Sequence, residues 1–222
     1  MATTPVGRGW PGRLIGALAA CACSLLVPGS LLAQACIGSP AARGHVAVGG
    51  NYFVSEQMSG YGVHGVANVL GPVSLGGEYG IIEYNGIEEK TTRIGASGAV
   101  EFTVASDVSV CPTVQAEYTT RHEPAAVSRD RTTLTIPFGV SVGILGHASA
   151  AELIPHVGGG MFFRRTAVEF ANGRSDSASE TGLFYNGGAT VAIWRVYAGM
   201  RISHSTLRGA TVVVRFSAGF RL

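Results

Sequence analysis

The chain has 222 residues, a length that suits one domain or two small ones. Charged residues make up 14% of it, against roughly 25% in an ordinary soluble domain, and 32 residues are glycine. This apolar composition excludes a disordered chain, and the near balance of 16 basic and 14 acidic residues, without a basic stripe, argues against a nucleic-acid partner.

Residues 1–35 have the pattern of a secretory signal peptide. Arg8 and Arg13 form a positive n-region, and a mostly apolar stretch follows as far as Leu32. The small-x-small sequence at 33–35 then predicts cleavage before Cys36. Two alternatives rank lower. A membrane anchor is disfavoured because Pro28, Gly29 and Ser30 interrupt the apolar run, and the lipoprotein-like box at 18–21 has a very short apolar region.

Cleavage changes both the charge and the cysteine content. Arg8 and Arg13 leave with the signal, so the mature chain is formally neutral and implies no polyanionic partner. Only Cys36 and Cys111 remain, and an exported chain with two cysteines favours one disulfide. Two unpaired thiols are the alternative.

After residue 35 the apolar residues recur with period two, which is typical of strands. The clearest run is 133–144, where Leu134, Ile136 and Phe138 begin an apolar face and Thr133 and Thr135 begin a small or polar one. Similar runs cover 94–104 and 108–118, and helical spacing fits none of them. No apolar stretch of 18 residues exists after residue 35, so the sequence offers no helical span.

Counting these runs predicts ten strands, with eight as the alternative. They span 44–54, 60–70, 73–84, 91–104, 108–120, 131–145, 152–168, 181–193, 196–204 and 211–222. Short connections alternate with longer, more polar ones, of which 122–130 and 170–180 are the longest. This rhythm indicates an all-β, antiparallel, up-and-down transmembrane barrel over residues 44–222. An even strand number places both termini in the periplasm, with 36–43 as a periplasmic segment. Pro137 falls inside a strong strand, where we expect a bulge.

The last strand carries the most specific signal. Its apolar face runs as far as the final residue: Val212, Val214, Phe216, Ala218, Phe220 and Leu222. It resembles the C-terminal assembly signal of bacterial outer-membrane barrels, although that signal usually ends in Phe or Trp. The chain thus resembles the small outer-membrane barrels typified by OmpA, OmpX and porin-like barrels. The resemblance implies a Gram-negative outer-membrane location, contact with membrane lipid and lipopolysaccharide, and insertion by the barrel-assembly machinery, with Phe216, Phe220 and Leu222 as the assembly signal.

The predicted barrel places the two cysteines of the predicted disulfide at the same end. Cys111 falls near the periplasmic start of its strand, and Cys36 lies just before the first strand at the same end. A bond between them would close a long loop and contribute roughly 4 kcal/mol in the loop-entropy model.

The polar phase of the strands faces the interior and holds charges of both signs. We predict that the glutamates pair with arginines, because charges removed from water need partners. The predicted network comprises Glu78, Arg93, Glu101, Glu117, Arg164, Arg201, Arg215 and Arg221. Such pairing would seal a narrow lumen. The alternative is a narrow water path lined by charge rings, which would make the chain a passive pore.

Enzymatic motifs are largely missing from the sequence. We find no Gly-x-Ser-x-Gly, no His-Glu-x-x-His and no Cys-x-x-Cys after residue 35, and we expect no cofactor and no metal. The segment 201–206 resembles the His-x-Ser segment of PagL lipid A deacylases, in which a His acts as base and a Ser as nucleophile. Here His204 is followed by Thr206 in the Ser position, and no acidic residue follows to orient the His.

The sequence therefore predicts a non-enzymatic barrel that serves envelope integrity or surface contacts through its outer loops. A narrow pore and a lipid A deacylase are the alternatives. A secreted lipocalin-like barrel would need an apolar interior, whereas the inward phase of 133–143 is polar or small.

Overall fold

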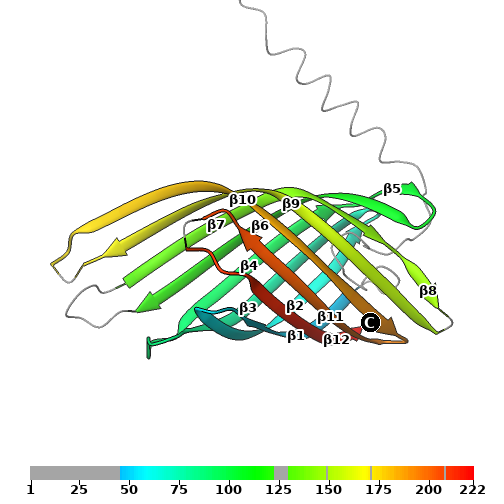
Figure 1. The fold of residues 1–222 in the computed structure, drawn as a ribbon, viewed down its shortest axis with the longest axis horizontal. Coiled ribbons are helices and arrows are strands. Elements are labelled where there is room, and N and C mark those ends of the chain that lie inside the picture. Colours follow the sequence, from blue (N-terminus) through cyan, green and yellow to red (C-terminus); the bar gives the residue numbers. More distant parts are fainter. Residues whose placement is uncertain (1–45, 123–129, 149, 171, 208) are drawn as a thin grey trace, which may run out of the picture. The chain divides into compact units, whose positions relative to one another are not determined.

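The computed structural model describes residues 46–122, 130–148, 150–170, 172–207 and 209–222. Almost all of these residues lie in β-strands (Figure 1). The strands are β1 (Val46–Val54), β2 (Met58–Leu70), β3 (Val73–Tyr84), β4 (Thr91–Val100), β5 (Phe102–Ala105), β6 (Val108–His122), β7 (Asp130–Ile144), β8 (Gly146–Ala148), β9 (Ala151–Glu169), β10 (Ser175–Ile193), β11 (Val196–Ser205) and β12 (Val213–Arg221). The predicted signal peptide and the predicted periplasmic segment 36–43 lie outside the described residues.

The strands form one antiparallel sheet that closes on itself. Neighbours in the chain pair with each other, and β1 pairs with β12 from Ala47–Arg221 to Val54–Val214. β4 and β5 are two parts of one strand beside β6, and β7 and β8 are two parts of one strand beside β9. The described strands therefore occupy ten positions around the barrel, which confirms the predicted ten-stranded fold.

The two ends of the barrel differ. At one end the strands are joined by tight connections at Gly71-Pro72, Ser106-Asp107 and Trp194-Arg195, and Val46 and Arg221 lie at this same end. Gly71 has φ +52°, a conformation that favours glycine in a turn. We call this the turn end and the opposite one the loop end. The alternation of short and long connections agrees with the sequence prediction.

The β9–β10 hairpin is longer than the sequence predicted. Both strands have 19 residues, and their pairing begins at Ser175–Glu169. Residues 175–180 were predicted to belong to a loop, but the connection is confined to 170–174. The prediction failed because these residues are polar and lack apolar alternation, whereas backbone pairing does not depend on it. The hairpin projects at the loop end (Figure 1).

Pro137 does not form the predicted bulge. The register between β6 and β7 is the same on both sides of it, with Val114 opposite Phe138 and Glu117 opposite Thr135. Only the two positions between these pairs leave the β6–β7 ladder. Proline has no N–H to donate, so the sheet opens locally without changing register.

The outward face of the barrel is apolar over its whole circumference. Its side chains are large, and their exposed fractions run from 45% at Ile202 to 61% at Val63. The residues in this range include Val63, Leu75, Ile94, Val114, Phe138, Val140, Leu153, Met161, Leu183 and Ile202. Tyrosines lie on the same outward phase toward the loop end: Tyr52, Tyr61, Tyr79, Tyr118 and Tyr185. A continuous apolar belt with tyrosines at its margin fits contact with lipid.

The inward face holds a mixture of polar and apolar side chains. Phe53, Ile82, Ile154 and Phe162 are at most 4% exposed and fill part of the interior beside charged residues. The interior is thus less uniformly polar than predicted. These four residues occupy inward positions that the sequence prediction did not single out.

Candidate functional site

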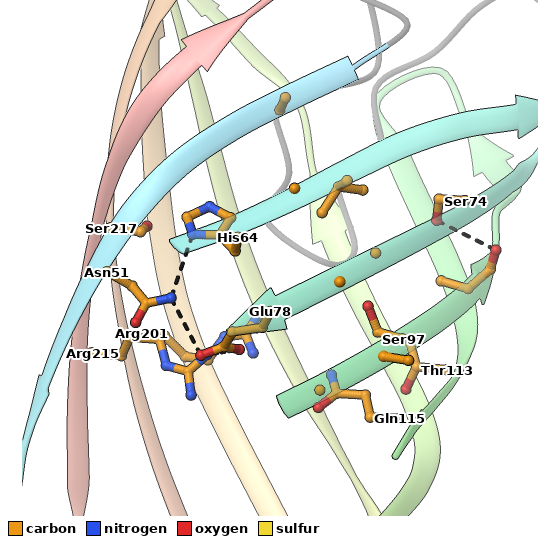
Figure 2. A pocket seen from close by; sticks show the side chains of 18 of the residues that line it. Asn51, His64, Ser74, Glu78, Ser97, Thr113, Gln115, Arg201, Arg215 and Ser217 are labelled. Atoms are coloured by element: carbon orange, nitrogen blue, oxygen red, sulfur yellow. Dashed lines mark hydrogen bonds and ion pairs between the residues drawn. The ribbon is translucent and has the colours of Figure 1, made fainter. Parts of the chain in front are cut away.

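Among the described residues, inward-facing side chains line two cavities of interest. The turn-end cavity has a volume of about 160 Å³ and is lined largely by small residues from β2, β3 and β4. The loop-end vestibule has a volume of about 430 Å³ and is lined by threonines and arginines. Figure 2 shows that the turn-end cavity gathers its charged residues at one side, away from Ser74, Ser97 and Thr113.

Four charged residues meet between these cavities and form what we call the central charge cluster: Glu78, Arg93, Glu117 and Arg215. Oε2 of Glu78 accepts hydrogen bonds from Nη1 of Arg215 at 3.0 Å and from Nη2 of Arg93 at 3.3 Å. Nη2 of Arg93 also lies 2.9 Å from Oε2 of Glu117. Arg93, Glu117 and Arg215 line both cavities, so the cluster forms the wall between them.

An aromatic ring supports this cluster from the side. The guanidinium groups of Arg93 and Arg215 lie 5.3 and 5.7 Å from the centre of the Phe53 ring, which is 1% exposed. Both distances are within the range of a cation–π interaction. Phe53 therefore fixes the positions of two arginines that share Glu78.

A hydrogen-bonded chain links the cluster to Tyr197 on β11. Nδ2 of Asn51 lies 3.3 Å from Oε1 of Glu78 and 3.4 Å from Nδ1 of His64 (Figure 2). Nε2 of His64 in turn lies 2.7 Å from the hydroxyl of Tyr197. This chain joins β3 to β11 through β1 and β2, and it holds Oε1 of Glu78 while the two arginines hold Oε2.

A second ion pair lies near the turn end. Nη1 of Arg221 pairs with Oε2 of Glu152, and the two side chains are 13% and 10% exposed. Nε of Arg221 donates to the backbone carbonyl of Trp194. The contacts of Arg221 therefore connect β12 to β9 and to the β10–β11 turn at the turn end of the barrel.

The predicted network divides between several places. Glu78, Arg93, Glu117 and Arg215 meet in the central cluster. Arg201 lines the turn-end cavity and stands opposite Arg215 in the β11–β12 register. Arg164 lies in the vestibule, Arg221 lies at the turn end, and Glu101 is half-buried at the break between β4 and β5.

Sequence reasoning missed two of the carboxylates that pair with these arginines. Arg221 contacts Glu152, and Nη1 of Arg164 lies 3.5 Å from Oε1 of Glu180. Both glutamates fall on the inward phase of their strands, so the alternation contained the signal. Glu180 was overlooked because it was placed in a loop, and Glu152 because it was placed at a strand end.

The structure leaves the predicted disulfide and assembly signal as predictions. Cys111 is 1% exposed and packs with Ala99. Cys36 lies outside the described residues. Phe216, Phe220 and Leu222 are exposed on the outward face, at 46%, 58% and 68%.

The PagL-like segment has a different geometry from a nucleophile–base pair. The His204 ring packs against the outward Tyr185 ring, with 5.3 Å between centroids. The Thr206 hydroxyl accepts a hydrogen bond from the Leu183 backbone N–H at 2.9 Å. In the part of the chain that the structure describes, no hydrogen bond joins His204 to Thr206.

Two further features are missing from the described ranges. They contain no helix long and apolar enough to cross a membrane. They also contain no group of three or more His, Cys, Asp or Glu side chains placed to hold a metal ion.

The closed antiparallel barrel, its apolar outer belt and its charge-paired interior together define the class of protein. This chain is a transmembrane β-barrel of the outer-membrane type.

Proteins similar to this chain are found among solved structures. No protein-family model and no curated protein matches the chain. Among solved structures, Ail from Yersinia pestis matches with 13% identity over 80% of this chain and 96% of that one, at a TM-score of 0.45. The translocator domain of the autotransporter NalP from Neisseria meningitidis matches with 12% identity over 95% of both chains, at 0.46. The outer-membrane enzyme PagL matches with 11% identity over 80% and 98%, at 0.35.

Proposed function

We propose that this chain is a non-enzymatic outer-membrane barrel with a closed lumen, which serves envelope integrity or surface contacts through its loop end. The observation that carries the proposal is the central charge cluster. It stands between the two cavities, and its charges are paired with one another and supported by Phe53. Paired charges packed in a narrow interior favour a filled barrel over a conducting one.

The test is the single-channel conductance of the refolded barrel in a planar bilayer. We expect the wild-type protein to be silent. The double variant Glu78→Ala/Arg93→Ala removes one charge of each sign from the cluster, so the lumen stays charge-balanced and gains space. We expect this variant to show steady openings, because the wall between the two cavities is then breached.

A matched pair at the surface provides the control. Glu83 and Lys90 form an ion pair of 2.8 Å, with side chains 45% and 60% exposed. The variant Glu83→Ala/Lys90→Ala also removes one charge of each sign, and we expect it to be as silent as wild type. Steady openings of the wild-type protein would overturn the closed lumen and favour the passive pore.

The proposal includes an orientation, with both termini in the periplasm and the loop end outside the cell. An epitope inserted after Gly86, in the β3–β4 connection, should bind antibody on intact cells. The same epitope inserted after Gly71, at the turn end, should bind only after the outer membrane is permeabilised. Both glycines have positive φ and open space around them, so an insertion at either site disturbs little. The reverse labelling pattern would show that the barrel is inserted the other way up.

The assembly signal and the contacts with lipid and lipopolysaccharide belong to the same proposal. The outward, exposed positions of Phe216, Phe220 and Leu222 support it, since an assembly machinery needs to reach them. The geometry around His204 and Thr206 gives the deacylase alternative no support, because the two side chains contact other groups.

A further inference from the structure

The loop-end vestibule has an excess of positive charge. Among the described residues that line it, five are arginines and two are glutamates: Arg93, Arg121, Arg131, Arg164 and Arg215 against Glu117 and Glu180. Arg93 and Arg215 form its floor, where the central cluster already supplies their carboxylates. On the walls, the excess comes from Arg131 and Arg164, since the one glutamate there among the described lining residues is Glu180.

Arg164 has only a weak carboxylate partner on the vestibule wall. It faces Glu180 at 3.5 Å, and the two side chains are 36% and 51% exposed. An ion pair this long and this exposed contributes little to stability. The guanidinium of Arg164 also lies 5.6 Å from the centre of the Phe162 ring, which helps to hold it in place. Arginine has five N–H donors, so Arg164 keeps donors for a ligand besides the one that contacts Glu180.

Two of the wall arginines stand directly opposite each other. Arg121 on β6 is the register partner of Arg131 on β7, and both line the vestibule. Arg121 is steadied by the Tyr84 ring, whose centre lies 5.4 Å from its guanidinium, while Arg131 is exposed. An anion bound at Arg131 would therefore lie beside a second guanidinium group.

Hydroxyl groups complete the wall. Thr91, the register partner of Arg121 on β4, is 3% exposed, and its Oγ1 has no hydrogen-bond partner among the described residues. One step deeper, Thr119, Thr133 and Thr166 form a row across β6, β7 and β9, with the Thr133 and Thr166 oxygens 3.3 Å apart. A buried hydroxyl without a partner is costly unless a ligand or water satisfies it.

We propose that the loop-end vestibule is a binding site for a water-soluble phosphate-type oxyanion that carries at least two negative charges. Guanidinium groups bind such anions through paired N–H donors, and the threonine hydroxyls supply further donors to the remaining oxygens. The site lies inside the barrel wall and is reached from the loop end, which separates it from phosphate groups of lipids outside the barrel. A volume of about 430 Å³ suits a small molecule.

The test uses isothermal titration calorimetry to measure the binding of inorganic pyrophosphate to the refolded barrel in detergent. We expect saturable binding to one site. Arg131→Ala and Arg164→Ala are each expected to weaken it about tenfold, as the loss of one hydrogen-bonded charge implies. Thr133→Val, which keeps the shape and removes only the hydroxyl, should weaken it several-fold and guards against misfolding of the arginine variants.

Arg165 provides the matched control. It is the chain neighbour of Arg164 but is exposed on the opposite face of β9, opposite Leu134. Arg165→Ala removes the same charge and should leave pyrophosphate binding unchanged. Equal weakening by Arg165→Ala would reveal general electrostatic attraction and overturn the site, as would an absence of binding by wild type.

A further arm separates the two sources of phosphate. A lipid phosphomonoester presented in the same micelles should not displace pyrophosphate, and displacement would overturn the assignment to a soluble ligand. The experiment measures binding and not conduction or orientation. Its outcome is therefore distinct from that of the proposed function.

Discussion

Val140→Arg is expected to prevent stable insertion of the barrel. Val140 lies on the outward face of β7 and is 49% exposed. Along β7, Val140 lies between Leu134 and Ile144. Leu134 pairs with Tyr118, one of the outward tyrosines toward the loop end, and Ile144 lies near the turn end. A charged side chain at this depth must be placed in hydrocarbon, which costs ~2–4 kcal/mol near the midplane. The free energy of unfolding of the barrel refolded in lipid vesicles measures this loss directly.

The conservative change Val140→Leu serves as the control, because it keeps an apolar side chain at the same depth. It should refold as wild type and give the same heat-modifiable band on a gel. If Val140→Arg inserted with unchanged stability, this face would not meet lipid, and the transmembrane assignment of β7 would be wrong.

The strand pattern was largely readable from the sequence because lipid imposes it. Val73–Tyr84 was predicted with the bounds that the structure shows, since each residue of that strand faces either lipid or the interior. The error at β10 came from the part of the hairpin beyond the apolar belt. There the side chains of residues 175–179 are polar or small on both faces of the strand, so they carry no apolar period-two signal.

The interior was harder to predict because alternation says which residues face inward but not which ones meet. Glu78 and Arg93 lie on neighbouring strands and meet along a diagonal, since Glu78 stands opposite Gly95 in the register. Glu78 and Arg215 lie on β3 and β12, with β1 and β2 between them. That contact depends on how far the strands are staggered when the barrel closes.

Closure of the barrel depends on glycines where β7 and β9 come close together. A substitution at this contact is the second change for which we expect a large effect. Gly139 and Gly160 stand directly opposite each other on the inward face. A Cβ atom at Gly160 would overlap the Phe138 carbonyl oxygen and lie 2.6 Å from the Gly139 Cα. Both obstacles are backbone atoms, which cannot rotate away as a flexible side chain would. We therefore expect Gly160→Ala to lower the free energy of unfolding by ~3 kcal/mol, at the upper end of overpacking costs.

Gly95→Ala is the matched control for this change. Gly95 is also an inward-facing strand glycine, but the nearest atoms to its Cβ position are the Glu78 Cβ at 3.6 Å and the Ala116 carbonyl oxygen at 3.8 Å. With ordinary contacts only, the alanine should cost nothing and gain about 0.4–1 kcal/mol by restricting the unfolded chain. Urea unfolding of both variants in detergent compares them. Equal stabilities would mean that β7 and β9 separate easily to admit a side chain, and that the glycine pair does not set the spacing of the barrel wall.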